Sequence, residues 1–214
     1  QLISHIGTMV PIATGLAWAE KYRKTNKAVL THIGEGGTSS GDFHEGINFA
    51  SVQKLPLVII IDNNQYAYKT LLEKQYACKS LILKSTGYGI PGFLVDGTNV
   101  LLVNHICDLA LKMARKGEGP VLIESITMRA SGHSVYDKFS DYVDMEDMQL
   151  WLEKRDPIKR YDKLLIDSKI ITKKELEDSH FRAKERARLA KDIALKSPFP
   201  EPEGMENEIF ADQK

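Results

Sequence analysis

Cysteine is scarce in this chain, because only Cys78 and Cys107 occur among its 214 residues. Two thiols without the spacing of metal ligands exclude a disulfide framework and a zinc site, and they favour a reducing compartment. Long apolar runs are missing as well. The longest uninterrupted one covers residues 57–61, far short of the roughly 20 residues that a membrane helix needs. We therefore expect no membrane segment.

An excess of charge of either sign is also missing, since Lys plus Arg and Asp plus Glu number 29 each. This balance argues against a protein that binds nucleic acid or a membrane surface, because such proteins are normally basic. Apolar residues at 43% and charged residues at 27% are typical of a soluble globular protein of one domain with a small appendage. The chain starts at Gln1 without a targeting signal, and we expect it to be part of a longer protein.

Short apolar runs alternate with helical patterns in the first two thirds of the chain. Runs that predict strands buried on both faces cover residues 29–33, 57–61 and 121–126. Patterns that predict helices cover residues 10–22, 42–54 and 100–116. This alternation predicts an α/β fold with a parallel, doubly wound sheet flanked by helices.

From Asp144 onward the pattern is helical and charged. Apolar positions between residues 151 and 165 predict a pair of helices, and a long helix should follow from Thr172 to about Lys196. Thr172 and Glu175 form the capping box of that long helix. We therefore expect a core at residues 1–143 and a helical C-terminal extension at 144–214, with an extended, proline-containing tail from Ser197.

The most informative stretch runs from Gly34 to Asp42, between a predicted strand and a predicted helix. Open α/β sheets bind ligands at such turns. Glycines let the backbone approach a phosphate, and a helix N-terminus supplies amide donors. The stretch lacks the lysine of a P-loop, and Glu35 would repel a pyrophosphate unless a divalent cation lay between them. Mg²⁺ suits that place, because it takes oxygen ligands from protein, phosphate and water.

A second source of oxygen ligands follows the next predicted strand, at Asn63 and Asn64. The Asn64 amide oxygen and a main-chain carbonyl of the following turn could both reach the cation. Taken alone, Asn64 could simply bond within its own turn. In combination, Gly-acid-Gly after one strand and Asn-Asn after the next form the motif of thiamin diphosphate enzymes.

At these residues the chain resembles the α subunits of the E1 component of 2-oxo acid dehydrogenases, over essentially its whole length. The matching blocks are residues 7–11, 41–50, 63–64, 87–90, 95–97, 129, 132–134, 137 and 156–158. Glu35 within Gly-Glu-Gly and the run at residues 46–50 resemble the branched-chain, or 2-oxoisovalerate, type. The resemblance implies a thiamin diphosphate-binding fold. It also implies oxidative decarboxylation of a branched-chain 2-oxo acid, a step of branched-chain amino acid catabolism, with acyl transfer to the lipoyl domain of an E2 core.

The resemblance also assigns the ligands of the cofactor's diphosphate. Glu35 through its carboxylate, Asn64 through its side-chain oxygen and Tyr66 through its carbonyl would bind Mg²⁺. The amides of Gly36 and Gly37 would face the diphosphate.

Four further residues match positions around the rest of the cofactor. The main chain at Ser4 and Ile6 would hold its aminopyrimidine and thiazolium region, and Arg129 would lie against the diphosphate. His133 would lie at the mouth of the site, stabilise or protonate intermediates and assist acyl transfer. A histidine suits this work because its ordinary pKa lies near working pH. Asp137 would order the loop that carries His133.

Some positions depart from the family pattern. Asp62 stands where branched-chain members often have an arginine near the diphosphate. Ile3 and Met9 replace oxygen ligands of a monovalent cation, so that we expect this second cation site to be absent. Val143 replaces an arginine that orders the preceding loop, in which Ser134 matches a serine that eukaryotic relatives phosphorylate.

The resemblance implies partners too. We expect a heterotetramer of two α and two β subunits, in which the E1 β subunit, or the β half of a fused chain, supplies the glutamate that activates the aminopyrimidine. A family segment that precedes Gln1 would add a Tyr-Arg pair to the diphosphate. The expected compartment is the cytoplasm for a bacterial protein and the mitochondrial matrix for a eukaryotic one, with the cytoplasm preferred.

Three alternatives remain at this point. A pyruvate or acetoin dehydrogenase E1 α subunit shares all of these motifs. A nicotinamide-dependent oxidoreductase would place a ribose-binding acid near Asp62, although Glu35 counts against it. A non-catalytic assembly module would keep the fold without the cofactor. Magnesium-dependent binding of thiamin diphosphate separates the thiamin enzymes from the other two.

Overall fold

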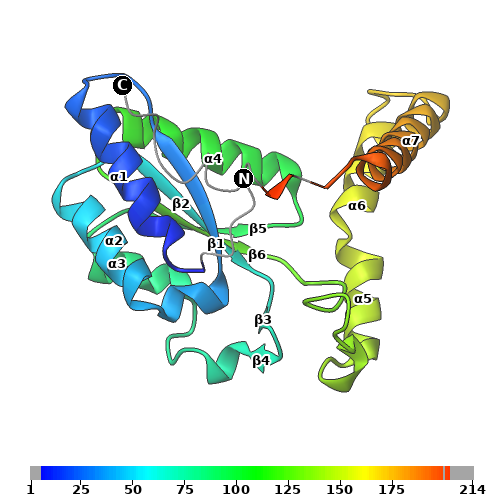
Figure 1. Ribbon diagram of the computed structural model, residues 1–214, viewed down its shortest axis with the longest axis horizontal. Coiled ribbons are helices and arrows are strands. Elements are labelled where there is room, and N and C mark those ends of the chain that lie inside the picture. Colours follow the sequence, from blue (N-terminus) through cyan, green and yellow to red (C-terminus); the bar gives the residue numbers. More distant parts are fainter. Residues whose placement is uncertain (1–5, 200, 203–214) are drawn as a thin grey trace. The chain divides into compact units, whose positions relative to one another are not determined.

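The computed structural model describes residues 6–199, 201 and 202. The chain divides into two compact units, residues 1–161 and 162–214, and the boundary in the sequence falls within helix α6 (Pro157–Asp167) (Figure 1). The expected division at residue 143 stays a prediction. Most of the expected tail beyond Ser197 lies outside the described residues.

The first unit is built on a parallel sheet of four strands. Their order is β1 (Val29–Gly34), β2 (Leu57–Asn63), β6 (Val121–Ile126) and β5 (Gly92–Asp96). The register pairs Gly34 with Asp62 and Asn63 with Ile126, so that the carboxyl ends of β1, β2 and β6 meet at one edge. The predicted parallel sheet is confirmed, as are the three predicted strands. The expectation that each of them is buried on both faces is wrong for β1, in which exposed and buried residues alternate at the edge of the sheet. Strand β5 was not predicted.

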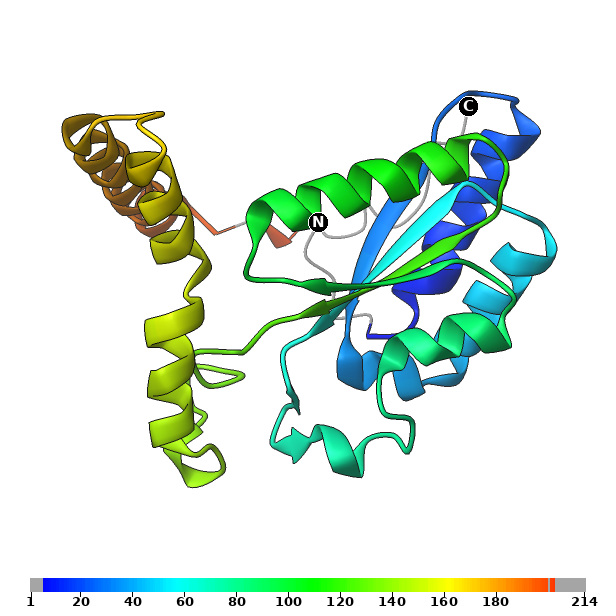
Figure 2. The same cartoon turned by 180° about the vertical axis from the view of Figure 1, so that it is seen from behind.

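Strand β2 shows why helices cover both faces of this sheet. Successive side chains of a strand point to opposite faces. Leu57 and Ile59 accordingly join a core with α1 (Met9–Tyr22) and α2 (Gly41–Val52), whereas Val58 joins a second core with α4 (Val100–Arg115). Figure 2 shows α4, in green, on the opposite side of the sheet from α1. All three predicted helices are confirmed.

Short elements connect the strands and helices of this unit. They are η1 (Glu35–Ser39), β3 (Tyr66–Ala67), β4 (Thr70–Leu71), η2 (Leu72–Lys74), η3 (Leu81–Leu83), α3 (Lys84–Gly87), η4 (Phe139–Asp141) and α5 (Met145–Arg155). Strands β3 and β4 pair in an antiparallel hairpin directly after β2. Four of the predicted site residues lie on these elements, namely Glu35, Gly36 and Gly37 on η1 and Tyr66 on β3.

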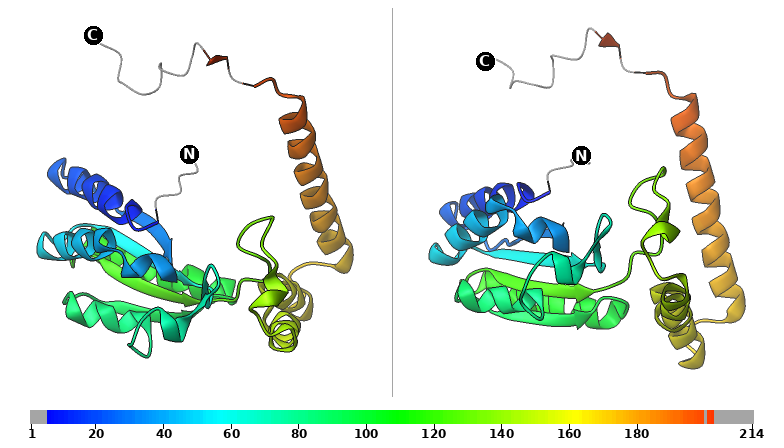
Figure 3. Two further views of the ribbon diagram at one scale, coloured as in Figure 1. Left: turned by 60° about the horizontal axis from the view of Figure 1, so that its bottom comes forward. Right: turned by 90° about the horizontal axis from the view of Figure 1, so that it is seen from below.

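The second unit contains the long helix α7 (Lys173–Lys196), which Figure 3 shows in orange as one uninterrupted helix. The predicted capping box is present, because the Thr172 hydroxyl accepts from the Glu175 amide while the Glu175 carboxylate accepts from the Thr172 amide. His180 bonds to Asp162 through Nε2 at 2.8 Å and joins α7 to α6. Among the described residues, none of the helices combines the length and the apolar composition needed to cross a membrane.

Candidate functional site

The predicted site residues converge because they follow the carboxyl ends of three adjacent strands. Glu35 follows β1, Asn64 follows β2, and Arg129 comes shortly after β6. The Asn64 amide donates to Glu35 Oε2 at 3.3 Å. Residues 35, 64 and 129, which are far apart in the chain, thus share one edge of the sheet, as the rule for open α/β sheets predicts.

Glu35 is a buried carboxylate that is only half satisfied. Its side chain is 1% exposed, and Oε1 has no hydrogen-bond partner among the residues described. Burial raises the pKa of Glu35, although the backbone amides of Glu35 and Asn64 and the Gln75 side chain partly offset that rise. A buried carboxylate oxygen without a donor is costly unless a cation or proton meets it. This oxygen therefore fits a divalent-cation ligand.

The two other predicted ligands lie in the turn opposite Glu35. Asn64 Oδ1 accepts from the Tyr66 amide at 3.3 Å, which makes the local turn foreseen as the alternative role of Asn64. The Tyr66 carbonyl accepts from Arg129 Nη1 at 3.2 Å. Each of these oxygens retains a second lone pair. Both can therefore still contact a cation.

The donor set points to a particular kind of cation. The described residues contain no group of three or more His, Cys, Asp and Glu side chains suited to a metal. A cation at Glu35 would therefore have one carboxylate and two neutral oxygens from this chain. That set suits Mg²⁺, which usually completes its shell with water and phosphate oxygens.

The glycines of η1 allow close packing against the hairpin. A Cβ on Gly36 would lie 2.5 Å from the Cβ of Ala67, and one on Gly37 would lie 2.8 Å from Ile33 and 3.0 Å from Ile6. The backbone of this turn is thus held close to Ala67 and to Ile6. Ser4 and Ile3 lie outside the described residues.

Lys84 supports the same turn and was not predicted. Its Nζ donates to the Thr38 carbonyl at 2.7 Å and to Thr38 Oγ1 at 3.1 Å, while Thr38 Oγ1 donates to the Glu35 carbonyl at 2.7 Å. Burial lowers the pKa of Lys84. No motif marks this lysine, because it lies on α3, 46 residues beyond Thr38.

The guanidinium of Arg129 donates hydrogen bonds within the chain. It donates to the carbonyls of Tyr66 at 3.2 Å, Tyr68 at 2.7 Å and Ser131 at 3.1 Å, and to the Tyr142 hydroxyl at 2.7 Å. It therefore ties the β3–β4 hairpin to the segment after β6. Its expected contact with a diphosphate stays a prediction.

His133 lies on an exposed loop close to the hairpin. Its amide donates to Asp137 Oδ2 at 2.8 Å, and its ring meets the ring of Tyr68 edge-on with centroids 5.0 Å apart. The Tyr142 hydroxyl donates to the same Asp137 oxygen at 2.5 Å. That hydrogen bond is the main reason why the pKa of Asp137 is held below its usual range. Asp137 therefore orders this loop, as the sequence predicted.

Two of the departures from the family pattern have local explanations. Asp62 accepts from Thr127 Oγ1 at 3.0 Å and lies near enough to Glu35 to raise its pKa further. Val143 is 6% exposed and belongs to a small core with Tyr66 and Met148, which supports the hairpin.

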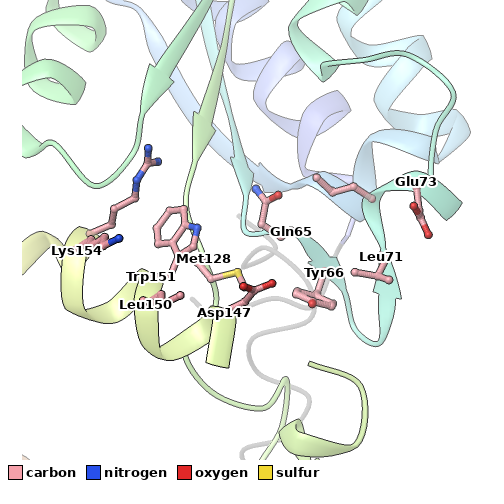
Figure 4. A pocket seen from close by; sticks show the side chains of 11 residues that line it. Gln65, Tyr66, Leu71, Glu73, Met128, Asp147, Leu150, Trp151 and Lys154 are labelled. Atoms are coloured by element: carbon pink, nitrogen blue, oxygen red, sulfur yellow. The ribbon is translucent and has the colours of Figure 1, made fainter. Parts of the chain in front are cut away.

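A cavity lies beside the predicted site rather than in it. Figure 4 shows this cleft between the hairpin, with Tyr66 and Leu71, and the side chains of Met128 and Trp151. Its volume is about 610 Å³. Tyr66 is the one predicted site residue that lines it.

Comparisons of the sequence with a family model and with individual proteins point to the same family. Residues 2–203 match the dehydrogenase E1 component family. The 2-oxoisovalerate dehydrogenase subunit alpha of Bacillus subtilis is 35% identical over 97% of this chain and 63% of its own length. The pyruvate dehydrogenase E1 component subunit alpha of Rhizobium meliloti is 31% identical over 96% of this chain and 59% of its own length.

A mitochondrial relative matches a shorter region. The 2-oxoisovalerate dehydrogenase subunit alpha 1 of Arabidopsis thaliana is 38% identical over 77% of this chain and 35% of its own length. The chain thus spans less than two thirds of the length of these relatives. The family match covers nearly all of the chain, and the chain belongs to the dehydrogenase E1 component family.

Proposed function

We propose that this chain carries the cation- and diphosphate-binding part of the α subunit of a thiamin diphosphate-dependent 2-oxo acid dehydrogenase. The observation that carries the proposal is the buried Glu35 Oε1, which has no hydrogen-bond partner in the described part of the chain. The other oxygen of the same carboxylate, Oε2, accepts from the Asn64 amide, and the glycines that follow Glu35 in η1 are closely packed. The E1 dehydrogenase family is thiamin diphosphate-dependent, and relatives named as 2-oxo acid dehydrogenase α subunits match over most of the chain.

In this proposal Glu35, Asn64 and Tyr66 hold Mg²⁺ through a carboxylate, an amide and a carbonyl oxygen. The amides of Gly36 and Gly37 donate to the diphosphate, which is favourable because they open η1 next to the cation. The main chain at Ser4 and Ile6 contacts the remainder of the cofactor. Thiamin diphosphate, when bound, would supply the carbon nucleophile and the electron sink that decarboxylation of a 2-oxo acid requires.

Arg129 and His133 have separate roles in the proposal. Arg129 keeps the hairpin in place through Tyr66 and Tyr68, and its remaining N–H can turn to a phosphate oxygen. His133 is exposed on a loop held by Asp137, where it can give a proton to, or take one from, a reacting group that arrives from outside.

The proposed substrate is a branched-chain 2-oxo acid. The names of the Bacillus subtilis and Arabidopsis thaliana relatives and Glu35 within Gly-Glu-Gly favour it. Pyruvate is the second candidate, because pyruvate dehydrogenase α subunits match at comparable identity. Acetoin remains a more distant alternative.

The proposed partners are an E1 β subunit, which would complete the active site, and the lipoyl domain of an E2 core. We further propose a bacterial, cytoplasmic protein, which the several bacterial relatives favour. A nicotinamide-dependent oxidoreductase or an assembly module would need neither the free Glu35 oxygen nor a cation.

The first test is calorimetric titration of thiamin diphosphate into the full-length protein assembled with its β subunit, with Mg²⁺ and with chelator. We expect binding only with Mg²⁺, and loss of binding in the Glu35→Ala variant. The matched control is Glu45→Ala, because Glu45 is an exposed acid on α2. Binding by Glu35→Ala with unchanged dependence on Mg²⁺ would contradict the assignment of the ligand. Absence of binding by the unaltered protein would contradict the proposed function.

The second test concerns the substrate. Decarboxylation of pyruvate and of 3-methyl-2-oxobutanoate should be measured side by side with an artificial electron acceptor. Preference for the branched acid supports the subclass, and preference for pyruvate keeps the family role but rejects the subclass. No turnover of either acid with the cofactor bound would direct attention to acetoin.

A further inference from the structure

Lys69 lies at the tip of the β3–β4 hairpin and faces the loop that carries His133. Its Nζ is 3.7 Å from Asp137 Oδ1. The same ammonium lies 5.5 Å from the ring centroid of Tyr142 and 5.7 Å from that of Tyr68. Both distances are within the range of cation–π attraction. One lysine thus contacts a carboxylate and two aromatic rings.

Asp137 needs such a cation because its side chain is buried within an otherwise exposed loop. The side chain is 0% exposed, while the neighbouring Val135 and Tyr136 are 92% and 95% exposed. Asp137 Oδ2 accepts from the His133 amide and the Tyr142 hydroxyl. Asp137 Oδ1 has no hydrogen-bond partner in the part of the chain described. A buried carboxylate is stable when a positive charge compensates it.

The neighbouring guanidinium does not satisfy that oxygen directly. Arg129 donates to three carbonyls and to the Tyr142 hydroxyl, so that it reaches Asp137 only through Tyr142. Lys69 is the cation that forms an ion pair with Asp137 itself. Lys69 therefore acts on Asp137 Oδ1, whereas Arg129 acts on Oδ2 through the Tyr142 hydroxyl.

The position of His133 depends on that of Asp137 because the two residues are bonded within the same loop. A Cβ on Gly132 would lie 2.7 Å from the Asp137 carbonyl oxygen, so that the two ends of the loop touch. The His133 amide is bonded to the Asp137 side chain, and the His133 ring packs on Tyr68, next to Lys69 in the hairpin. The hairpin thus contacts the loop at two points, through Lys69 at Asp137 and through Tyr68 at His133.

We propose that Lys69 is a positioning residue, which fixes the loop of residues 132–137, and with it His133, by pairing with Asp137 from the hairpin. The contribution of the fixed loop to catalysis rests on the proposed role of His133. The fixing of the loop does not rest on that role. Nothing in the motifs of the sequence marks Lys69, which lies 68 residues before Asp137.

The test compares Lys69→Met, which keeps the length and loses the charge, with Lys69→Arg, which keeps the charge. The control is Lys74→Met, because Lys74 is an exposed lysine in η2. Chymotrypsin cleavage after the exposed Tyr136 reports opening of the loop under native conditions. We expect Lys69→Met to be cleaved about tenfold faster at an unchanged unfolding temperature, and Lys69→Arg and Lys74→Met to be cleaved at the original rate. Equal rates for all variants would overturn the proposal.

A double-mutant cycle separates this ion pair from a general effect of the hairpin. In the Asp137→Asn background, the change Lys69→Met should no longer accelerate cleavage, because the partner charge is gone. Additive acceleration by the two changes would overturn the pairing.

Acyl transfer to a lipoyl domain, measured in the assembled enzyme, tests the proposed function independently. A lower kcat with unchanged KM for the 2-oxo acid in Lys69→Met, restored in Lys69→Arg, supports both proposals. Faster cleavage with normal acyl transfer supports the fixing of the loop by Lys69 and contradicts the role of His133.

Discussion

The side-chain amide of Asn63 donates to Glu124 Oε1 at 2.7 Å, which joins the carboxyl-terminal half of β2 to the adjacent strand β6. Both side chains are 1% exposed. The other carboxylate oxygen of Glu124 accepts from the Ile82 amide at 2.8 Å and from the Ser80 hydroxyl. Glu124 therefore fixes the point from which the chain turns into Asn64.

Replacement of Glu124 should destabilise the fold rather than alter chemistry directly. Glu124→Ala removes an acceptor of the buried Asn63 side-chain amide and of the half-buried Ile82 amide, and we expect the free energy of unfolding to fall by roughly 2–5 kcal/mol. Urea denaturation measures this loss. Glu118→Ala, at an exposed acid before β6, should change it by less than about 0.5 kcal/mol. A loss below about 1 kcal/mol in Glu124→Ala would show that the carboxylate does not support this network.

A methyl group on Gly36 should disturb the contact between η1 and the hairpin. It would lie 2.5 Å from the Cβ of Ala67, and such overpacking costs about 1–3 kcal/mol. The second change Ala67→Gly leaves the Ala67 Cα position 3.4 Å away, so that the double variant should recover most of the stability. Thermal unfolding compares the variants. Gly87→Ala is the control, since nothing lies within 4 Å of its Cβ position. If the double variant did not recover stability, the loss in Gly36→Ala would not come from the contact with Ala67.

Glu35→Gln should stabilise the folded chain and weaken binding of the cation. Because burial raises the pKa of Glu35, the ionised carboxylate destabilises the fold once the pH rises through that raised pKa. We expect the variant to be more stable than the unaltered protein at pH 7. This gain should vanish below the ordinary glutamate pKa of about 4.3, where the Glu35 carboxyl is protonated in both the folded and the unfolded protein. Denaturation at both pH values tests this in the presence of chelator.

The same variant should bind Mn²⁺, used as a probe for Mg²⁺, more than about 100-fold more weakly, because loss of a direct ligand exceeds the usual effect of outer residues. Electron paramagnetic resonance measures free Mn²⁺ directly. A variant that is less stable at pH 7 and still binds Mn²⁺ would assign Glu35 to the structure rather than to the cation.

Acid should weaken the salt bridge between Asp96 and Arg160. Asp96 Oδ2 pairs with Arg160 at 2.9 Å, and Oδ1 accepts from the Thr98 amide and hydroxyl at 3.0 and 2.6 Å. Burial acts to raise the pKa of Asp96, but the bonds from Thr98 and Arg160 outweigh it and lower that pKa. The stability from this pair is therefore fully present above the unfolded pKa of about 3.9 and is lost as the pH falls through the lower folded pKa.

In Asp96→Asn this part of the acid dependence should disappear. Unfolding monitored between pH 5 and pH 2, about the range in which aspartates titrate, compares the variant with the unaltered protein. Asp108→Asn, at an exposed residue of α4, should retain the full dependence. If the free energy of unfolding depended on pH in the same way in all three proteins, the role of Asp96 would be contradicted.

The sequence predicted β1, β2 and β6 from short runs rich in apolar residues, and it missed β5. The run in β2 is uninterrupted over residues 57–61, whereas β1 includes Thr31 and His32 and β6 includes Glu124 and Ser125. Strand β5 is short and largely exposed or half-buried at the edge of the sheet, with only Val95 buried, so that its pattern resembles a loop. The two-residue strands β3 and β4 are too short for any periodicity.

The same contrast holds for the site. Glu35 and Asn64 could be grouped in advance, because each follows a predicted strand and carboxyl ends of parallel strands meet. Arg129 was assigned to the site only through the family resemblance. The residues that hold them were not foreseen. Glu124 carried a signal, since an acid within an apolar strand needs a buried partner, but its partner Asn63 is 61 residues away. Such pairs depend on the register between strands, which local sequence does not encode.

The strand order has a consequence for how the chain is made. Strand β6 is the last of the four in the sequence, yet it lies between β2 and β5. During synthesis β5 therefore has no neighbour, and β2 has one open edge, until residues 121–126 have emerged. Open strand edges invite pairing with other chains, and distant pairings close slowly. We expect a nascent chain truncated before β6 to be held by chaperones or to aggregate, and insertion of β6 to be the step that completes both the sheet and the turn of Asn64.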